Sequence, residues 1–227
     1  MTVLTLVKLS YFIAATLFLL GLLRMSSPKT ARSGIQWAGV GMVLATVATF
    51  FLPGLHNGGL MIVAIVIGVA VNWLWGKKVA ITDMPQMVAL FNGMGGGSAV
   101  AIGAVELIKA SGGDTEHTRF ALALAVLGAL IGAVSLTGSI IAWAKLDGRM
   151  DKRYTFSGQQ YFNACVALVT VLAGGMALYT LSLPWIIAFF VLALLLGVLM
   201  TLPIGGADMP VVISLYNAFT GLAVAFE

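Results

Sequence analysis

The chain has 227 residues, of which 60% are hydrophobic and 9% are charged, and its net charge is +4. Soluble domains carry about 25% charged residues, so this composition excludes an ordinary soluble protein and predicts an integral membrane protein. The basic residues flank long apolar runs and are not interleaved with aromatic residues, which argues against a partner that is a nucleic acid.

Eight apolar runs are expected to form helices that cross a lipid bilayer. About 20 residues span the hydrocarbon core, and a helix satisfies its own backbone hydrogen bonds there. The predicted fold is therefore all-α, a polytopic bundle of transmembrane helices. Turn-forming Pro and Gly sequences separate several of the runs. In chain order the expected helices are 3–23, 34–52, 59–75, 84–109, 120–144, 161–181, 185–202 and 209–227.

The lysine and arginine residues predict how these helices are oriented. Most of them fall in alternate loops on one side, which hold Arg24, Lys29, Arg32, Lys77, Lys78, Lys145, Arg149, Lys152 and Arg153. Only Lys109 and Arg119 fall in loops on the other side. Because positive loops stay inside, the rich side is expected to be cytoplasmic and the N-terminus to be outside.

One segment of the sequence occurs twice. DMPQMVALFN begins at Asp83 and ends at Asn92, and DMPVVISLYN begins at Asp208 and ends at Asn217. The same offset relates several neighbouring helices, which predicts two tandem four-helix units, residues 1–110 and 119–227, in the same orientation. Both DMP segments are then expected to enter the membrane from the cytoplasmic side.

The repeated residues have a structural and a functional interpretation. A proline in the first turn is harmless, and an aspartate before it can cap the helix. Asp83 and Asp208 are thus either helix caps or carboxylates at a cytoplasmic mouth. Nine residues advance a helix by about 13 Å, which places Asn92 and Asn217 near the bilayer centre. There an asparagine either joins two helices by a hydrogen bond or lines a hydrated proton path.

Three further features accompany the repeat. The glycines that follow Asn92 are expected to allow close approach of another helix or to loosen their own helix beside water. The hydroxyls of Ser135, Thr137 and Ser139 either bond to the preceding turn or continue a polar track from Asn92. Glu106 is either an interfacial partner of Lys109 or an outer exit group for protons.

Three blocks of sequence carry a resemblance to a known family. They are TDMPQMVALFNGMGGGSA, SLTGSIIAWAKL and GGADMPVVISLYNAFTG. At these residues the chain closely resembles the β subunit of proton-translocating nicotinamide nucleotide transhydrogenase, an enzyme complex of the bacterial inner membrane. The likeness concerns the membrane domain only, which here would be residues 1–227. The family's soluble NADP(H)-binding domain would lie beyond Glu227.

The resemblance implies a function and a set of partners. The family couples inward proton translocation to hydride transfer from NADH to NADP⁺, which takes place on soluble domains. No nucleotide cofactor would be bound by this chain, because NAD(H) and NADP(H) would sit on those domains. The implied partners are the α subunit with its membrane helices, the two soluble domains, and a second complex in a dimer. A transporter of a small solute built from parallel repeats and a passive membrane scaffold are the alternatives.

The resemblance also implies residue roles. Asn92, Ser139 and Asn217 fall on positions that line the family's proton path, and Asp208 falls at its cytoplasmic mouth. Many family members carry a histidine where this chain has Asn92, and histidine is the natural proton carrier near neutral pH. An amide cannot titrate in that range. Either the family role is lost in this chain, or a histidine on a partner α-subunit helix occupies the same cavity, and we expect the second.

Overall fold

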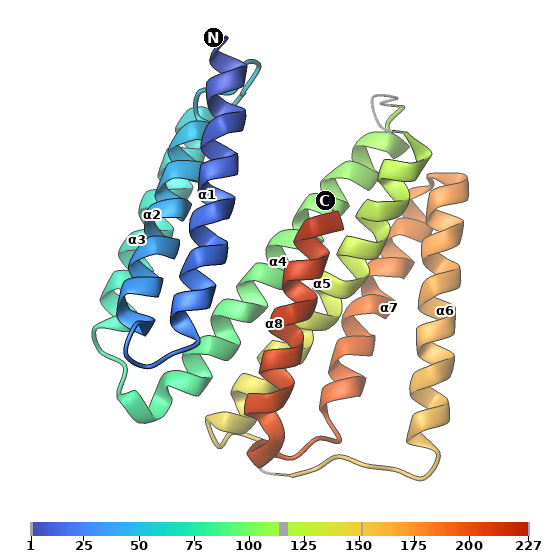
Figure 1. The fold of residues 1–227 in the computed structure, drawn as a ribbon. Coiled ribbons are helices and arrows are strands. Elements are labelled where there is room, and N and C mark those ends of the chain that lie inside the picture. The colour runs from blue at the N-terminus through green and yellow to red at the C-terminus, as the bar shows by residue number, and fades with distance from the viewer. Residues whose placement is uncertain (1, 114–117, 151, 227) are drawn as a thin grey trace. The chain divides into compact units, whose positions relative to one another are not determined.

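The computed structural model describes residues 2–113, 118–150 and 152–226. These residues form eight α-helices and two 3₁₀ turns, η1 and η2, with no strand in the described ranges, so the all-α prediction is confirmed (Figure 1). The helices are α1 (Val3–Met25), α2 (Ala31–Thr49), α3 (Gly58–Gly76), α4 (Met84–Ser111), α5 (Arg119–Leu146), α6 (Gln159–Thr180), α7 (Leu183–Thr201) and α8 (Met209–Phe226).

Seven of the described helices are long and apolar enough to cross a membrane. The less apolar α2 is not among them, although it was expected to be a membrane helix. Glu227, the expected last residue of the final helix, lies outside the described residues. The chain is a membrane protein.

The chain divides into two compact units, Met1–Lys78 and Val79–Glu227. The first holds α1, α2 and α3, and the second holds the other five helices. This division does not follow the expected four-helix units 1–110 and 119–227, since α4 packs with the later helices. Duplicated sequences need not pack as separate bodies, so the duplication itself stays a prediction.

Within the first unit, α1 and α2 form a close helix pair. A Cβ atom added to Gly34 would lie 2.6 Å from the carbonyl oxygen of Gly21, so the two backbones nearly touch. At the other end of the pair, the hydroxyls of Tyr11 and Thr49 are 2.8 Å apart. Small residues permit such close approach in membranes. By contrast, α3 has no buried residue.

The second unit is built around α5. This helix packs against α4, α7 and α8, and α6 packs mainly on α7 (Figure 1). Buried apolar side chains fill the space between α4, α5, α6 and α7, with Leu107, Ile186 and Phe189 at most 2% exposed. The central position of α5 places its hydroxyl residues among several neighbouring helices.

Both DMP segments begin with the same local backbone. A 3₁₀ turn, η1 (Ile81–Asp83) or η2 (Gly206–Asp208), leads directly into α4 or α8. Pro85 lies in the first turn of α4, where a missing N–H is tolerated. Asp83 occupies the N-cap position of α4, but its side chain accepts no capping hydrogen bond. Its carboxylate instead accepts a hydrogen bond of 3.2 Å from the Thr82 hydroxyl.

Candidate functional site

The glycines after Asn92 bring α4 into backbone contact with α5. A Cβ on Gly96 would lie 2.7 Å from the carbonyl oxygen of Gly132, and a Cβ on Gly132 would lie 2.8 Å from that of Gly96. One turn earlier, a Cβ on Gly93 would meet the Cβ of Ser139 at 3.2 Å. The glycines thus permit close helix approach, and α4 remains helical throughout Met84–Ser111.

This close crossing encloses Asn92 among hydroxyl groups. Its Nδ2 atom donates to Ser139 Oγ at 2.9 Å and to Ser135 Oγ at 3.1 Å. Asn92 is 6% exposed and both serines are fully buried. The structure therefore brings together two of the three predicted path residues, Asn92 and Ser139, on adjacent helices in a membrane-spanning bundle.

The third helix of the site is α8, which reaches Ser135 from the other side. Ser135 Oγ donates to the carbonyl oxygen of Tyr216 at 3.2 Å. It also lies 2.6 Å from the Thr220 hydroxyl. Because the single Ser135 hydroxyl proton is directed to Tyr216, Thr220 is the donor in that contact. Asn92, Ser135, Ser139 and Thr220 form a continuous group of hydrogen-bonded side chains, which we call the Asn92 network.

One atom of the Asn92 network has no partner. The Oδ1 atom of Asn92 is buried and accepts no hydrogen bond from any described residue. An unsatisfied buried acceptor costs about 1–3 kcal/mol. The amide therefore retains one unused acceptor in the centre of the helix bundle, where a donor would be bound favourably.

Tyr216 fixes the rotation of α8 about its own axis. Its ring lies against Gly138, where an added Cβ would come within 2.5 Å of the ring. Its hydroxyl forms a hydrogen bond with that of Thr201 in α7, and the residue is 3% exposed. Tyr216 and Thr220 were not predicted from the sequence. Tyr216 contributes a backbone carbonyl oxygen, which leaves no signal in a sequence. For Thr220, the short spacing from Asn217 is the signal that could have indicated it.

Asn217 lies apart from the Asn92 network. It is exposed in this chain, and no hydrogen bond is described for it. Successive helical residues point about 100° apart, so the buried position of Tyr216 turns Asn217 away from Ser135. The structure thus leaves the third predicted path residue on an open face of α8.

The two aspartates lie at the end of the bundle where α4 and α8 begin. Asp208 accepts a hydrogen bond of 3.2 Å from Arg153, in the connection between α5 and α6. Both side chains of this ion pair are more than half exposed. Asp83 is also exposed, and its described side-chain contact is with the neighbouring Thr82. Neither carboxylate reaches the Asn92 network.

Glu106 is at the opposite end of α4. It lines a cavity of about 210 Å³ formed between α4, α5 and the last turn of α8. The other lining residues are Ile102, Ala121, Leu122, Leu124, Ala125 and Phe226. The cavity gives this carboxylate a partly enclosed position beside the same three helices that build the Asn92 network.

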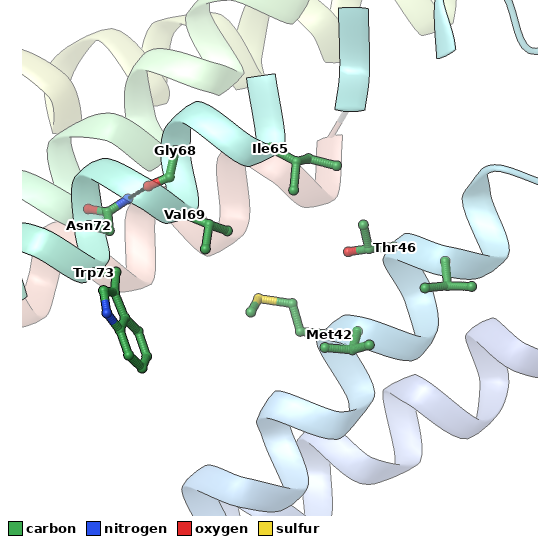
Figure 2. A pocket seen from close by; sticks show the side chains of 9 residues that line it. Met42, Thr46, Ile65, Gly68, Val69, Asn72 and Trp73 are labelled. Atoms are coloured by element: carbon green, nitrogen blue, oxygen red, sulfur yellow. Dashed lines mark hydrogen bonds between the residues drawn. The ribbon is translucent and has the colours of Figure 1, made fainter. Parts of the chain in front are cut away.

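A larger groove lies in the first unit, between α2 and α3 (Figure 2). It measures about 760 Å³, and its lining includes Met42, Ile65, Val69 and Trp73. Asn72 reaches it, but the Asn72 Nδ2 atom donates to the Gly68 carbonyl oxygen of its own helix. The groove therefore lacks the convergent polar groups that a site for a small polar solute needs.

The described residues offer no metal centre. No group of three or more histidine, cysteine, aspartate or glutamate side chains comes together within the described ranges. The Asn92 network itself consists of amide and hydroxyl groups, which exchange hydrogen bonds but do not carry charge at neutral pH.

Comparison with known proteins decides the family. The family model described as NAD(P) transhydrogenase beta subunit matches residues 7–227. The chain belongs to the NAD(P) transhydrogenase β-subunit family. Two curated relatives named NAD(P) transhydrogenase subunit beta, both from Rhodospirillum rubrum, are each 37% identical to it over 221 residues. The alignment covers 95% of this chain and 48% of each relative, so the chain spans about half their length.

Membership in the transhydrogenase β-subunit family agrees with the resemblance seen in the sequence. The three blocks that carried it lie in η1 with α4, in α5, and in η2 with α8. These are the helices that supply the Asn92 network. The part of a β subunit that this chain spans is thus a bundle of membrane helices.

Proposed function

We propose that this chain is the proton-conducting membrane part of a transhydrogenase, coupling inward proton movement to hydride transfer from NADH to NADP⁺ on soluble domains. The observation that carries the proposal is the Asn92 network, a buried line of amide and hydroxyl groups inside a membrane-spanning bundle. The network joins four side chains from three helices. Polar side chains hydrogen-bond between membrane helices, and polar residues at membrane depth also mark ion pathways.

The network orients hydrogen bonds but needs a proton carrier from outside this chain. Asn92 has an unused buried acceptor, which suits the N–H of an imidazole or a water molecule. We place a histidine of an α-subunit membrane helix beside Asn92, since imidazole titrates near neutral pH. A complex whose partner helices lacked any titratable group at this depth would contradict this assignment.

The remaining candidate residues take positions along the same route. Asp83 and Asp208 mark the cytoplasmic mouth, where the NADP(H)-binding domain docks. Glu106, in its cavity at the far end of α4, is the outer exit group. Asn217 faces the partner helices, which explains why it is exposed when the chain is considered without its partners. The chain is oriented with its N-terminus outside the inner membrane, and the complex is a dimer.

The nucleotides belong to other parts of the complex. The described residues form membrane helices and short connections, which provide no strand–turn–helix unit to hold a dinucleotide phosphate. By the family resemblance, NADP(H) and NAD(H) are assigned to the soluble domains of the complex. This chain's part in the reaction is to move a proton and to change how the NADP(H) domain is held.

Substitution of Asn217 tests the proposal in the assembled complex. We expect Asn217→Leu to abolish proton uptake into membrane vesicles while leaving NADP(H) binding intact. Asn163→Leu is the matched control, because Asn163 bonds to the Leu199 carbonyl oxygen in α7 and lies outside the Asn92 network. Unchanged proton uptake in Asn217→Leu would overturn the placement of Asn217 on the path.

A further inference from the structure

The end of α5 carries a lysine that the proposed proton path does not use. Lys145 is 5% exposed, unlike Lys152 and Arg149 in the following connection, which are exposed. Its ammonium group donates to the carbonyl oxygens of Leu202 and Ile204 at 2.5 Å and of Thr201 at 3.3 Å. An ammonium group has three donors, so each has an acceptor.

These three acceptors lie where α7 ends. The last carbonyls of a helix have no donor within the helix and carry the negative end of its dipole. A cation placed there is stabilised, and a buried cation requires such partners. Lys145 of α5 therefore caps α7 from a neighbouring helix, and it extends the cap to Ile204 in the connection to α8.

The segment after α5 binds the same connection. The backbone N–H of Tyr154 donates to the carbonyl oxygen of Leu202 at 3.3 Å. Arg153 pairs with Asp208, the last residue before α8. The Arg153 guanidinium also lies so close to Gly205 that a Cβ there would be 2.5 Å from its Nε atom. Donors from residues 145–154 thus converge on residues 201–208.

This connection determines where α8 starts. Thr201 is held by Lys145 through its carbonyl oxygen, and its hydroxyl binds the Tyr216 hydroxyl. Tyr216 in turn presents its carbonyl oxygen to Ser135. Tyr216 and Thr220 lie within about the first three turns of α8, so a shift of residues 202–208 would move both relative to Ser135.

We propose that Lys145 is a positioning residue, which fixes the start of α8 and thereby holds Tyr216 and Thr220 against Ser135. The placement of α8 is a claim about geometry. Its effect on proton movement rests on the proposed function.

A cysteine cross-link measures that geometry in the assembled complex. Cys165→Ala removes the native thiol, and Ser135→Cys with Thr220→Cys replaces two hydroxyls that are 2.6 Å apart. Disulfide formation requires close, well-oriented Cβ atoms, so we expect Lys145→Gln to lower the cross-link yield by about threefold or more. Lys152→Gln removes the same charge from the neighbouring exposed connection and is expected to leave the yield unchanged.

The outcomes separate the two proposals. An unchanged yield in Lys145→Gln, or an equal fall in Lys152→Gln, overturns the positioning role. If Lys145→Gln does not reach the membrane, Lys145→Met, which also removes the three donors and keeps an unbranched side chain, is scored by the same yield: a fall supports the role and no change overturns it. Without the cysteines, Lys145→Gln should also lower the number of protons moved per hydride transferred. A reduced cross-link yield with a normal ratio keeps the positioning role and contradicts the Asn92 network as the path.

Discussion

The two DMP segments share a sequence pattern and a 3₁₀ entry into their helices, but their surroundings differ at both ends. In the first segment, the start is exposed and has few contacts, whereas Asn92 is buried and bonded to two serines. In the second, Asp208 is paired with Arg153 beside the Lys145 cap, whereas Asn217 is exposed.

This difference shows that a repeated motif need not repeat its environment. The first copy completes its polar contacts inside the chain, where α4 meets α5. The second copy uses the residue before its asparagine, Tyr216, for internal packing and leaves the asparagine itself available to other helices. The same substitution is therefore expected to change the stability of the protein by different amounts at the two asparagines.

The largest expected effect comes from the glycines that the repeat aligns. In Gly96→Leu, the new Cβ atom would lie 2.7 Å from the Gly132 carbonyl oxygen. We expect this variant to lower the free energy of unfolding by about 3 kcal/mol, which is the upper end of the usual cost of overpacking. Gly221, its counterpart in α8, has no atom within 4 Å of an added Cβ, so Gly221→Leu should be nearly neutral. Thermal unfolding of the detergent-purified protein measures both. Equal losses of stability in the two variants would contradict the expected difference between α4 and α8.

Next in size is the effect of the two asparagines on stability. Asn92→Leu removes the donor to two buried serine hydroxyls, which we expect to cost about 1–3 kcal/mol. Asn217→Leu alters an exposed position and should leave the unfolding temperature unchanged. The same thermal measurement applies, and a more severe loss in Asn217→Leu would show that α8 is rotated from its described position.

The smallest expected effect concerns the two aspartates. Exposed ion pairs contribute about 0–1 kcal/mol and are screened by salt. Asp208→Asn should therefore lower the unfolding temperature slightly at low salt and not at high salt. Asp83→Asn breaks no described ion pair and should show no salt-dependent change. A salt-dependent loss in Asp83→Asn alone would reverse the comparison.

Most of the fold could be predicted because the apolar runs are long and bounded by turn residues. The expected starts and ends of the helices differ from the observed ones by three residues or fewer. The division into two compact units could not be predicted, because it depends on which helices touch. The apolar residues of a membrane helix surround it on all sides, so their pattern does not say which face is inside.

The residues of the site could be predicted only where a polar side chain interrupts an apolar helix. Asn92 and Ser139 stood out as polar residues in apolar helices, and the structure joins them. The Tyr216 carbonyl group is common to every residue, so no sequence pattern could identify it. Lys145 was grouped with the cytoplasmic cations, because the sequence does not show that its ammonium faces three carbonyl oxygens.

The most direct test of the central claim is the ratio of protons moved to hydrides transferred by the reconstituted complex carrying Asn92→Leu. The ratio does not depend on how much complex is present, so it separates conduction from stability. We expect Asn92→Leu to lower it by about tenfold or more, since a leucine cannot pass on a hydrogen bond, and Asn163→Leu to leave it unchanged. A normal ratio in Asn92→Leu would contradict the claim that the Asn92 network lies on the proton path.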